Sequence, residues 1–134
     1  MKNIGIWLDK EKAHIISIEN KIENFRTIQS NIENFHVRGG SGTKFKGGPQ
    51  DVVQDRKYLE REKHQLKSYF KKITTQLRNA DSIVIFGPAE TYLKLKRELE
   101  NNYTTINTKV KNVKKSNSMT ENQLKAWVKD YFEN

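Results

Sequence analysis

Short apolar segments separated by polar turns occupy the first quarter of the chain. Ile4–Leu8 and Ala13–Ile18 are rich in β-branched residues and flank the charged turn Asp9–Lys12, a pattern that predicts a β-hairpin. The following stretch, Ile22–Ile32, alternates more loosely between apolar and polar residues. We therefore expect three antiparallel strands in this part of the chain.

A helical period replaces the alternation farther along. Between Val52 and Leu77 the apolar residues recur at the spacing of one helix face; they are Leu59, Leu66, Phe70, Ile73 and Leu77. Another face repeats cations at helical spacing, namely Arg56, Lys63, Lys67 and Lys71. The pattern predicts one long helix with a buried stripe beside a basic row.

Two strand–helix units follow this helix. Asp81–Gly87 has the composition of a buried strand, and Gly87 with Pro88 is expected to open a helix that runs to Asn102. Ile106–Val113 alternates and predicts the last strand. Thr120 and Gln123 form a capping-box signature for a final helix, whose predicted buried face consists of Leu124, Trp127, Val128 and Tyr131.

The predicted order of elements is βββ-α-β-α-β-α. With 134 residues, the chain is long enough for one domain with a modest core, and we expect that domain to span residues 1–134. Strands joined through helices favour right-handed crossovers in a mixed sheet. The expected fold class is therefore α/β with an RNase H-like mixed sheet, in which the first strand lies near the centre.

Positive charge is concentrated between Arg38 and Arg78. The chain carries a net charge of +9, and this segment alone holds eleven basic and four acidic residues. It also contains five of the seven glycines, all within the stretch 36–51, which we expect to be a mobile loop before the first helix. A localised positive field favours polyanions, above all nucleic acid; a basic surface that serves solubility is the alternative.

Other chemistry has weak support in the sequence. Asp9 follows the first strand, where a nuclease of this fold would place a metal ligand, but the later strands offer no convincing partner. Asp81 comes before the apolar residues of its strand, Glu90 falls in the first turn of a helix, and INTKVKNV has no acid, so a turn role is favoured for Asp9. His14, His36 and His64 have no ligand or triad spacing, and the glycine loop matches no nucleotide-binding motif. We expect no metal and no cofactor.

The expected cellular compartment follows from features that the sequence lacks. It has no cysteine, its N-terminus has no apolar signal region, and no apolar run approaches the ~20 residues of a membrane span. A cytoplasmic protein without a membrane partner is expected.

Several segments together resemble a known family. The runs RGGSGTKF, YLEREKHQLKSYFKKITTQL, DSIVIFGPAETYLKLKREL and INTKVKNV are similar, in this order, to the central domain of archaeal and eukaryotic class I peptide chain release factors. Bacterial release-factor-like proteins and the Pelota rescue factors are related to that family. The resemblance implies an RNase H-like sheet and a Gly-Gly-Gln loop that enters the peptidyl transferase centre of the ribosome and promotes hydrolysis of peptidyl-tRNA.

The loop departs from the family motif at Ser41, at Lys44, where the family has arginine before phenylalanine, and at Pro49. Gly39 and Gly40 match the family glycines, but Ser41 stands in place of glutamine, while in Gly47-Gly48-Pro49-Gln50 a proline precedes the glutamine. Proline fixes its own φ and restricts the residue before it. Hydrolysis is therefore left open, and the residues assigned to it are Gly39, Gly40, Gly47, Gly48 and Gln50.

The leading hypothesis is a translation factor that binds the ribosome or tRNA, as a stand-alone central domain, in termination, rescue or dormancy. A further protein partner would supply the domains that full-length factors carry. The RNA-binding residues are expected to be Arg38, Lys44, Phe45, Lys46, Arg56, Lys63, Lys67 and Lys71. The alternative is a non-catalytic RNA-binding or protein-interaction module.

Overall fold

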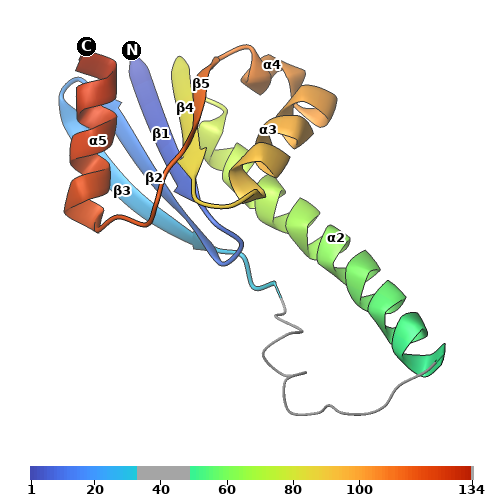
Figure 1. The fold of residues 1–134 in the computed structure, drawn as a ribbon. Helices are drawn as coiled ribbons and strands as arrows, with labels where there is room; N and C mark the ends of the chain where they lie inside the picture. The colour runs from blue at the N-terminus through green and yellow to red at the C-terminus, as the bar shows by residue number, and fades with distance from the viewer. Residues whose placement is uncertain (33–48, 134) are drawn as a thin grey trace.

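The computed structural model describes residues 1–32 and 49–133, with side chains from Glu60 onward in the second range. One five-stranded sheet carries helices on both faces (Figure 1). The elements are β1 (Lys2–Leu8), β2 (Lys12–Glu19), β3 (Ile22–Gln29), α2 (Pro49–Leu77), β4 (Ser82–Gly87), α3 (Thr91–Asn102), α4 (Thr104–Asn107), β5 (Val110–Lys115) and α5 (Glu121–Glu133).

The strands are arranged in the order β3-β2-β1-β4-β5. β1 pairs with β2 and β2 with β3 in antiparallel fashion, while β1–β4 and β4–β5 are parallel. The sheet is therefore mixed and β1 lies at its centre, which confirms the predicted fold class. β1 has a paired strand on each edge, and helices cover both faces of the sheet. Five consecutive residues of β1, Ile4 to Leu8, are therefore buried.

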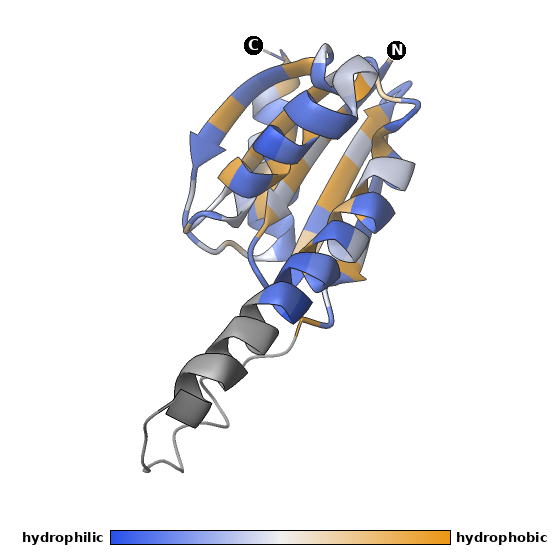
Figure 2. Cartoon of the chain, turned by 90° about the vertical axis from the view of Figure 1, so that its right-hand side faces the viewer, coloured by the Kyte–Doolittle hydropathy of each residue, from blue (hydrophilic) through white to orange (hydrophobic). Residues whose placement is uncertain are grey.

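The two faces of the sheet form separate cores because successive strand residues point to opposite sides. Ile4, Ile6 and Leu8 pack with the apolar faces of α2 and α3. Trp7, between them in sequence, packs on the other side with Leu124 and Val128 of α5. Figure 2 shows the resulting division, with apolar residues concentrated on the strands and hydrophilic residues on the outward sides of α2 and α3.

Three predicted boundaries are wrong. α2 begins at Pro49, inside the predicted loop 36–51, with proline in the first helical position that suits its fixed φ. α3 begins at Thr91, after Glu90 at its N-cap, and not at the Gly87-Pro88 pair. The third strand ends at Gln29, and Asn31 has a φ of 58°.

The predicted strand Ile106–Val113 is also partly wrong. Its first residues form the short helix α4, in which the amides of Asn107 and Thr108 donate to the carbonyl oxygens of Tyr103 and Thr104. Ile106 is buried in the core through this turn. One helical turn buries Ile106 as well as a strand would, so burial of this residue does not require a strand here. β5 starts only at Val110.

The predicted capping box of α5 is confirmed. The Gln123 amide donates to Thr120 Oγ1 at 3.2 Å, and the Thr120 amide donates to Gln123 Oε1 at 2.9 Å. These reciprocal bonds satisfy amides that a helix start leaves free. They fix the point at which α5 begins to cross the sheet.

Candidate nucleic-acid interface

α2 is held against the sheet by a buried tyrosine. Tyr69 is 0% exposed, and its hydroxyl donates a hydrogen bond of 3.0 Å to the backbone carbonyl oxygen of Asp9 in the β1–β2 turn. Burial raises the pKa of the Tyr69 hydroxyl well above its usual value, and the nearby Asp9 carboxylate adds to the shift. Tyr69 is therefore a neutral donor under all ordinary conditions.

Two polar contacts fix α2 from either side of this bond. Lys10, in the same turn, forms an ion pair with Glu62. Closer to the end of the helix, Arg26 Nη1 of β3 donates to Gln76 Oε1 at 3.0 Å. Polar contacts near the surface contribute little individually, but together with the apolar stripe these two set the rotation of α2 about its axis.

That rotation leaves the predicted basic row in solvent. Lys63, Lys67 and Lys71 are all exposed and recur every four residues, so their Cα atoms rise by about 6 Å from one to the next along one side of the helix. Phe70, Ile73 and Leu77 are buried against the sheet. A row of ammonium groups on one side of an anchored helix can neutralise neighbouring phosphates of a nucleic acid.

The remaining predicted residues lie partly or wholly outside the described residues. Gln50 is in the first turn of α2 and Arg56 within the same helix, but only their backbone is described. The other eight residues assigned to RNA binding or hydrolysis lie in the segment 33–48, outside the described residues, and stay predictions: Arg38, Gly39, Gly40, Lys44, Phe45, Lys46, Gly47 and Gly48.

Asp9 is a turn residue, as the sequence favoured. Its Oδ1 accepts hydrogen bonds from the amides of Glu11 at 2.8 Å and Lys12 at 2.9 Å, the geometry by which Asp stabilises a turn. Among the described side chains, those of residues 1–32 and 60–133, no three His, Cys, Asp or Glu groups are placed so as to hold a metal ion.

His14 lies on one face of β2. Its ring stacks between Trp7 and Phe25, with centroids 5.5 Å and 5.3 Å away, and Nδ1 lies 2.9 Å from Thr27 Oγ1. Burial lowers the pKa of His14, and Lys12 lowers it further, while Asp9 and Glu121 oppose the shift. In this position a neutral imidazole ring packs against its aromatic neighbours on the surface of the sheet.

The sequence pattern missed one feature of α2 and one of α5. Tyr69 was absent from the predicted stripe, although it lies four residues before Ile73 on the same side of α2. Trp127 and Tyr131 were assigned to the buried face of α5, yet both remain partly exposed while Leu124 and Val128 are fully buried. The four-residue spacing of the two aromatic residues was the available signal.

Comparison with known proteins gives a likeness of fold. No protein-family model matches the sequence, and no curated protein sequence matches it significantly. Among solved structures, the Pelota protein of Thermoplasma acidophilum superposes over 96% of this chain with a TM-score of 0.57 and 18% sequence identity. The fold resembles part of Pelota.

The matched part is 32% of the Pelota chain, so this chain spans about a third of that protein's length. An archaeal translation termination factor, aRF1, also matches, over 98% of this chain and 39% of its own, with 10% identity and a TM-score of 0.45. At these identities the likeness to Pelota establishes the architecture, and the role of the basic row is a separate question.

Membrane insertion through a helix has no support in the described part of the chain. None of the helices there combines the length and the apolar character that a membrane span requires.

Proposed function

We propose that this chain is a translation factor that binds the ribosome or tRNA through the basic row of α2. The observation that carries the proposal is the exposed row Lys63, Lys67 and Lys71 on a helix anchored to a sheet whose fold resembles part of Pelota. The release-factor resemblance of the sequence supports the same role, in termination, rescue or dormancy. A cytoplasmic location and a partner protein that supplies further domains belong to this proposal.

The physical basis of binding is charge neutralisation of phosphates. Lysines displace counterions from nucleic acid, so affinity falls as salt rises, with a log–log slope of about −0.9 per phosphate contact on a B-form DNA duplex and about −0.7 on a single strand. The basic row cannot read a base sequence from outside a helix groove. Specificity for a ribosomal state would come from the shape of the site and from the segment that precedes α2.

The experiment is co-sedimentation of the chain with ribosomes at several salt concentrations. Lys67→Gln with Lys71→Gln should weaken binding and reduce the salt slope by about 0.7 to 0.9 for each lysine. The control, Lys94→Gln with Arg97→Gln, removes two exposed cations from α3 and should leave the slope as it is. Binding that does not depend on salt, or no binding to ribosomes, would reject the proposal in favour of a protein-interaction module.

The finer proposal is that the glycine loop promotes hydrolysis of peptidyl-tRNA. Glycines allow the backbone to approach a reacting carbonyl, and a backbone N–H can stabilise the oxyanion that develops there. Gln50→Ala, and Gly47→Ala with Gly48→Ala, should then abolish release of a labelled peptide from ribosome-bound tRNA without loss of binding. Unchanged release would remove these residues from the mechanism and leave a binding protein.

A further inference from the structure

A cavity opens on the opposite side of the sheet from the basic row. It has a volume of about 630 Å³ and lies between β5 and α5, with Ser82 of β4 at its border. This volume is within the range of small-molecule sites, about 300 to 1,000 Å³. Its walls combine two lysines, Lys111 and Lys114, with three aromatic residues, Trp127, Tyr131 and Phe132.

An irregularity of β5 brings both lysines to the cavity. Lys111 and Lys114 are three residues apart, a spacing that places side chains on opposite faces of a regular strand. The register passes from Ile83–Val110 directly to Val84–Asn112, so Lys111 is an extra residue in β5. Such a bulge redirects side chains, and bulges occur often beside functional sites.

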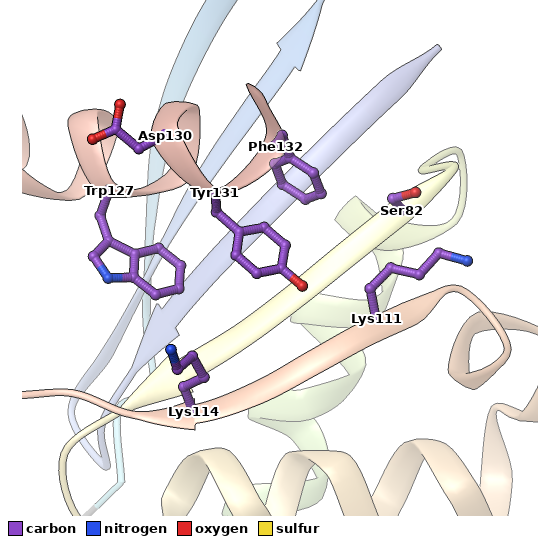
Figure 3. A pocket seen from close by; sticks show the side chains of 7 residues that line it. All are labelled: Ser82, Lys111, Lys114, Trp127, Asp130, Tyr131 and Phe132. Carbon is purple, nitrogen blue, oxygen red and sulfur yellow. The ribbon is translucent and has the colours of Figure 1, made fainter. Parts of the chain in front are cut away.

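The pairing of Lys114 identifies the face. Lys114 lies opposite Phe86, and Phe86 packs in the core on the α5 side. Figure 3 shows Lys111 and Lys114 extending from β5 into the space below α5, where Trp127 and Tyr131 descend toward them. Both lysines are exposed, so their ammonium groups are free to meet a ligand.

The aromatic residues form a continuous platform. Trp127 stacks on Phe86 at a centroid distance of 4.1 Å, and the Tyr131 ring is almost parallel to Trp127, with an interplanar angle of 6° and a centroid distance of 5.7 Å. Contact with Phe86 supports Trp127 from the core, while its partial exposure leaves ring surface available. A supported, parallel pair of rings is a suitable surface for a flat base.

We propose that this cavity binds single-stranded RNA, with one base on the Trp127–Tyr131 platform and the flanking phosphates at Lys111 and Lys114. Proteins that bind single-stranded nucleic acid without sequence preference combine aromatic rings, on which bases stack, with cations that contact the phosphates. Asp130 also borders the cavity, but its carboxylate points away from the strands (Figure 3). The site lies on the α5 face and does not depend on the role proposed for α2.

The two tryptophans of the chain supply a direct assay. Trp7 is 2% exposed, and its Nε1 donates to the carbonyl oxygen of Asn117, so a base can reach only Trp127. Titration of the full chain with single-stranded oligouridylate of about eight nucleotides should quench the fluorescence of Trp127 to saturation. In Trp127→Phe, which retains a ring on Phe86, the oligonucleotide should leave the emission of Trp7 unchanged.

Charge variants with opposite expected effects test the cation pair. Lys111→Gln with Lys114→Gln should reduce the salt slope of quenching by about 0.7 for each lysine. Asp130→Asn should strengthen binding about two- to fivefold, because it removes a negative charge from the border. The α3 control, Lys94→Gln with Arg97→Gln, should leave both the affinity and the slope unchanged.

The platform is tested by Tyr131→Leu, which should weaken binding about tenfold through loss of stacking. The thermal midpoint of this variant shows whether it has folded, and the exposed lysine pair provides a second variant that does not disturb the core. The proposal is overturned if single-stranded RNA fails to quench Trp127 at low salt. Equal or stronger quenching by an RNA duplex or by oligoglutamate would also overturn it, and oligoglutamate would indicate an acidic polypeptide as the occupant.

Discussion

The hydroxyl of Tyr69 donates a hydrogen bond to the carbonyl oxygen of Asp9 at 3.0 Å and so joins the C-terminal half of α2 to the β1–β2 turn. The donor is fully buried, and the two residues are separated by 60 positions in the sequence. The bond is therefore a tertiary constraint on the helix that carries the basic row. It also accounts for a polar group inside an otherwise apolar interface.

Tyr69→Phe should lower the free energy of unfolding by about 1 kcal/mol, since it removes one donor and leaves the half-buried carbonyl oxygen of Asp9 without its partner. Urea denaturation should show a lower midpoint, while the dependence of the unfolding free energy on urea concentration stays the same. Tyr103→Phe is the matched control, because no described residue makes a hydrogen bond with the Tyr103 hydroxyl; its midpoint should stay near that of the parent. Equal midpoints for all three proteins would show that the bond contributes nothing.

Gly5 allows α5 to lie close to the sheet. A Cβ atom at this position would be 2.3 Å from Val128 Cγ2 and 2.9 Å from Cγ1, so Gly5→Ala should destabilise the domain by about 1 to 3 kcal/mol through overpacking. Val128→Ala removes both methyl groups. The double variant should therefore be less destabilised than the sum of the single variants, which a double-mutant cycle measures.

Gly87 provides the contrast for that cycle. A Cβ atom there would be 2.3 Å from the backbone carbonyl oxygen of Leu8, a contact that no side-chain truncation relieves. Gly87→Ala should be destabilising both in the parent and in the Val128→Ala background, with additive effects. Rescue of Gly87→Ala by Val128→Ala, or no rescue of Gly5→Ala, would contradict the assigned contacts.

The turn between β2 and β3 should be open to stabilisation. Asn20 and Lys21 both have positive φ, 54° and 69°, as two-residue hairpin turns of type I′ require. Lys21→Gly should raise the free energy of unfolding by about 0.5 to 1 kcal/mol, because glycine adopts this conformation without a Cβ penalty. Glu23→Gly, within β3, should have the opposite effect in the same thermal melt; a loss of stability in both would disprove the argument.

His14 should make stability depend on pH. Its pKa is lowered in the folded protein by burial and by Lys12, so below about pH 6.5, the pKa of an unperturbed histidine, the unfolded chain binds a proton that the folded chain resists. The contribution of the neutral ring is complete above that pH and is lost as the pH falls through the lower, folded pKa.

Thermal midpoints measured from about pH 7.5 to 5 should therefore decline in the parent and decline less in His14→Gln. The exposed His64 gives the control, His64→Gln, which should retain the decline of the parent. A parent-like decline in His14→Gln would assign the effect to other groups.

The sequence predicted what local periodicity determines. The strands up to Glu19, the buried stripe Phe70–Ile73–Leu77, the exposed row on α2 and the capping box of α5 follow from the order of apolar, charged and capping residues. The central place of β1 followed from the order of the elements.

Features that depend on tertiary structure were not predictable in this way. Ile106 has the same apolar character in a strand or in a helical turn, and only its packing against the core selects α4. The bulge at Lys111 is visible only in the pairing of β4 with β5. Strict alternation along the sequence would instead place Lys111 and Lys114 on opposite faces of the sheet. Tyr69 has a polar end, and its burial is explained only by the carbonyl group that it meets.

The central position of β1 has a consequence for how the chain folds. β1 meets β2 across a short turn, but it meets β4 only after the chain has returned from residue 81, where the Lys2 amide donates to the Asp81 carboxylate at 2.7 Å over a separation of 79 residues. A hairpin forms in microseconds, whereas contacts of long sequence separation slow folding. We therefore expect the β1–β2 hairpin to form first, with one edge of β1 unpaired, and the β1–β4 pairing to follow only when the second half of the chain is in place.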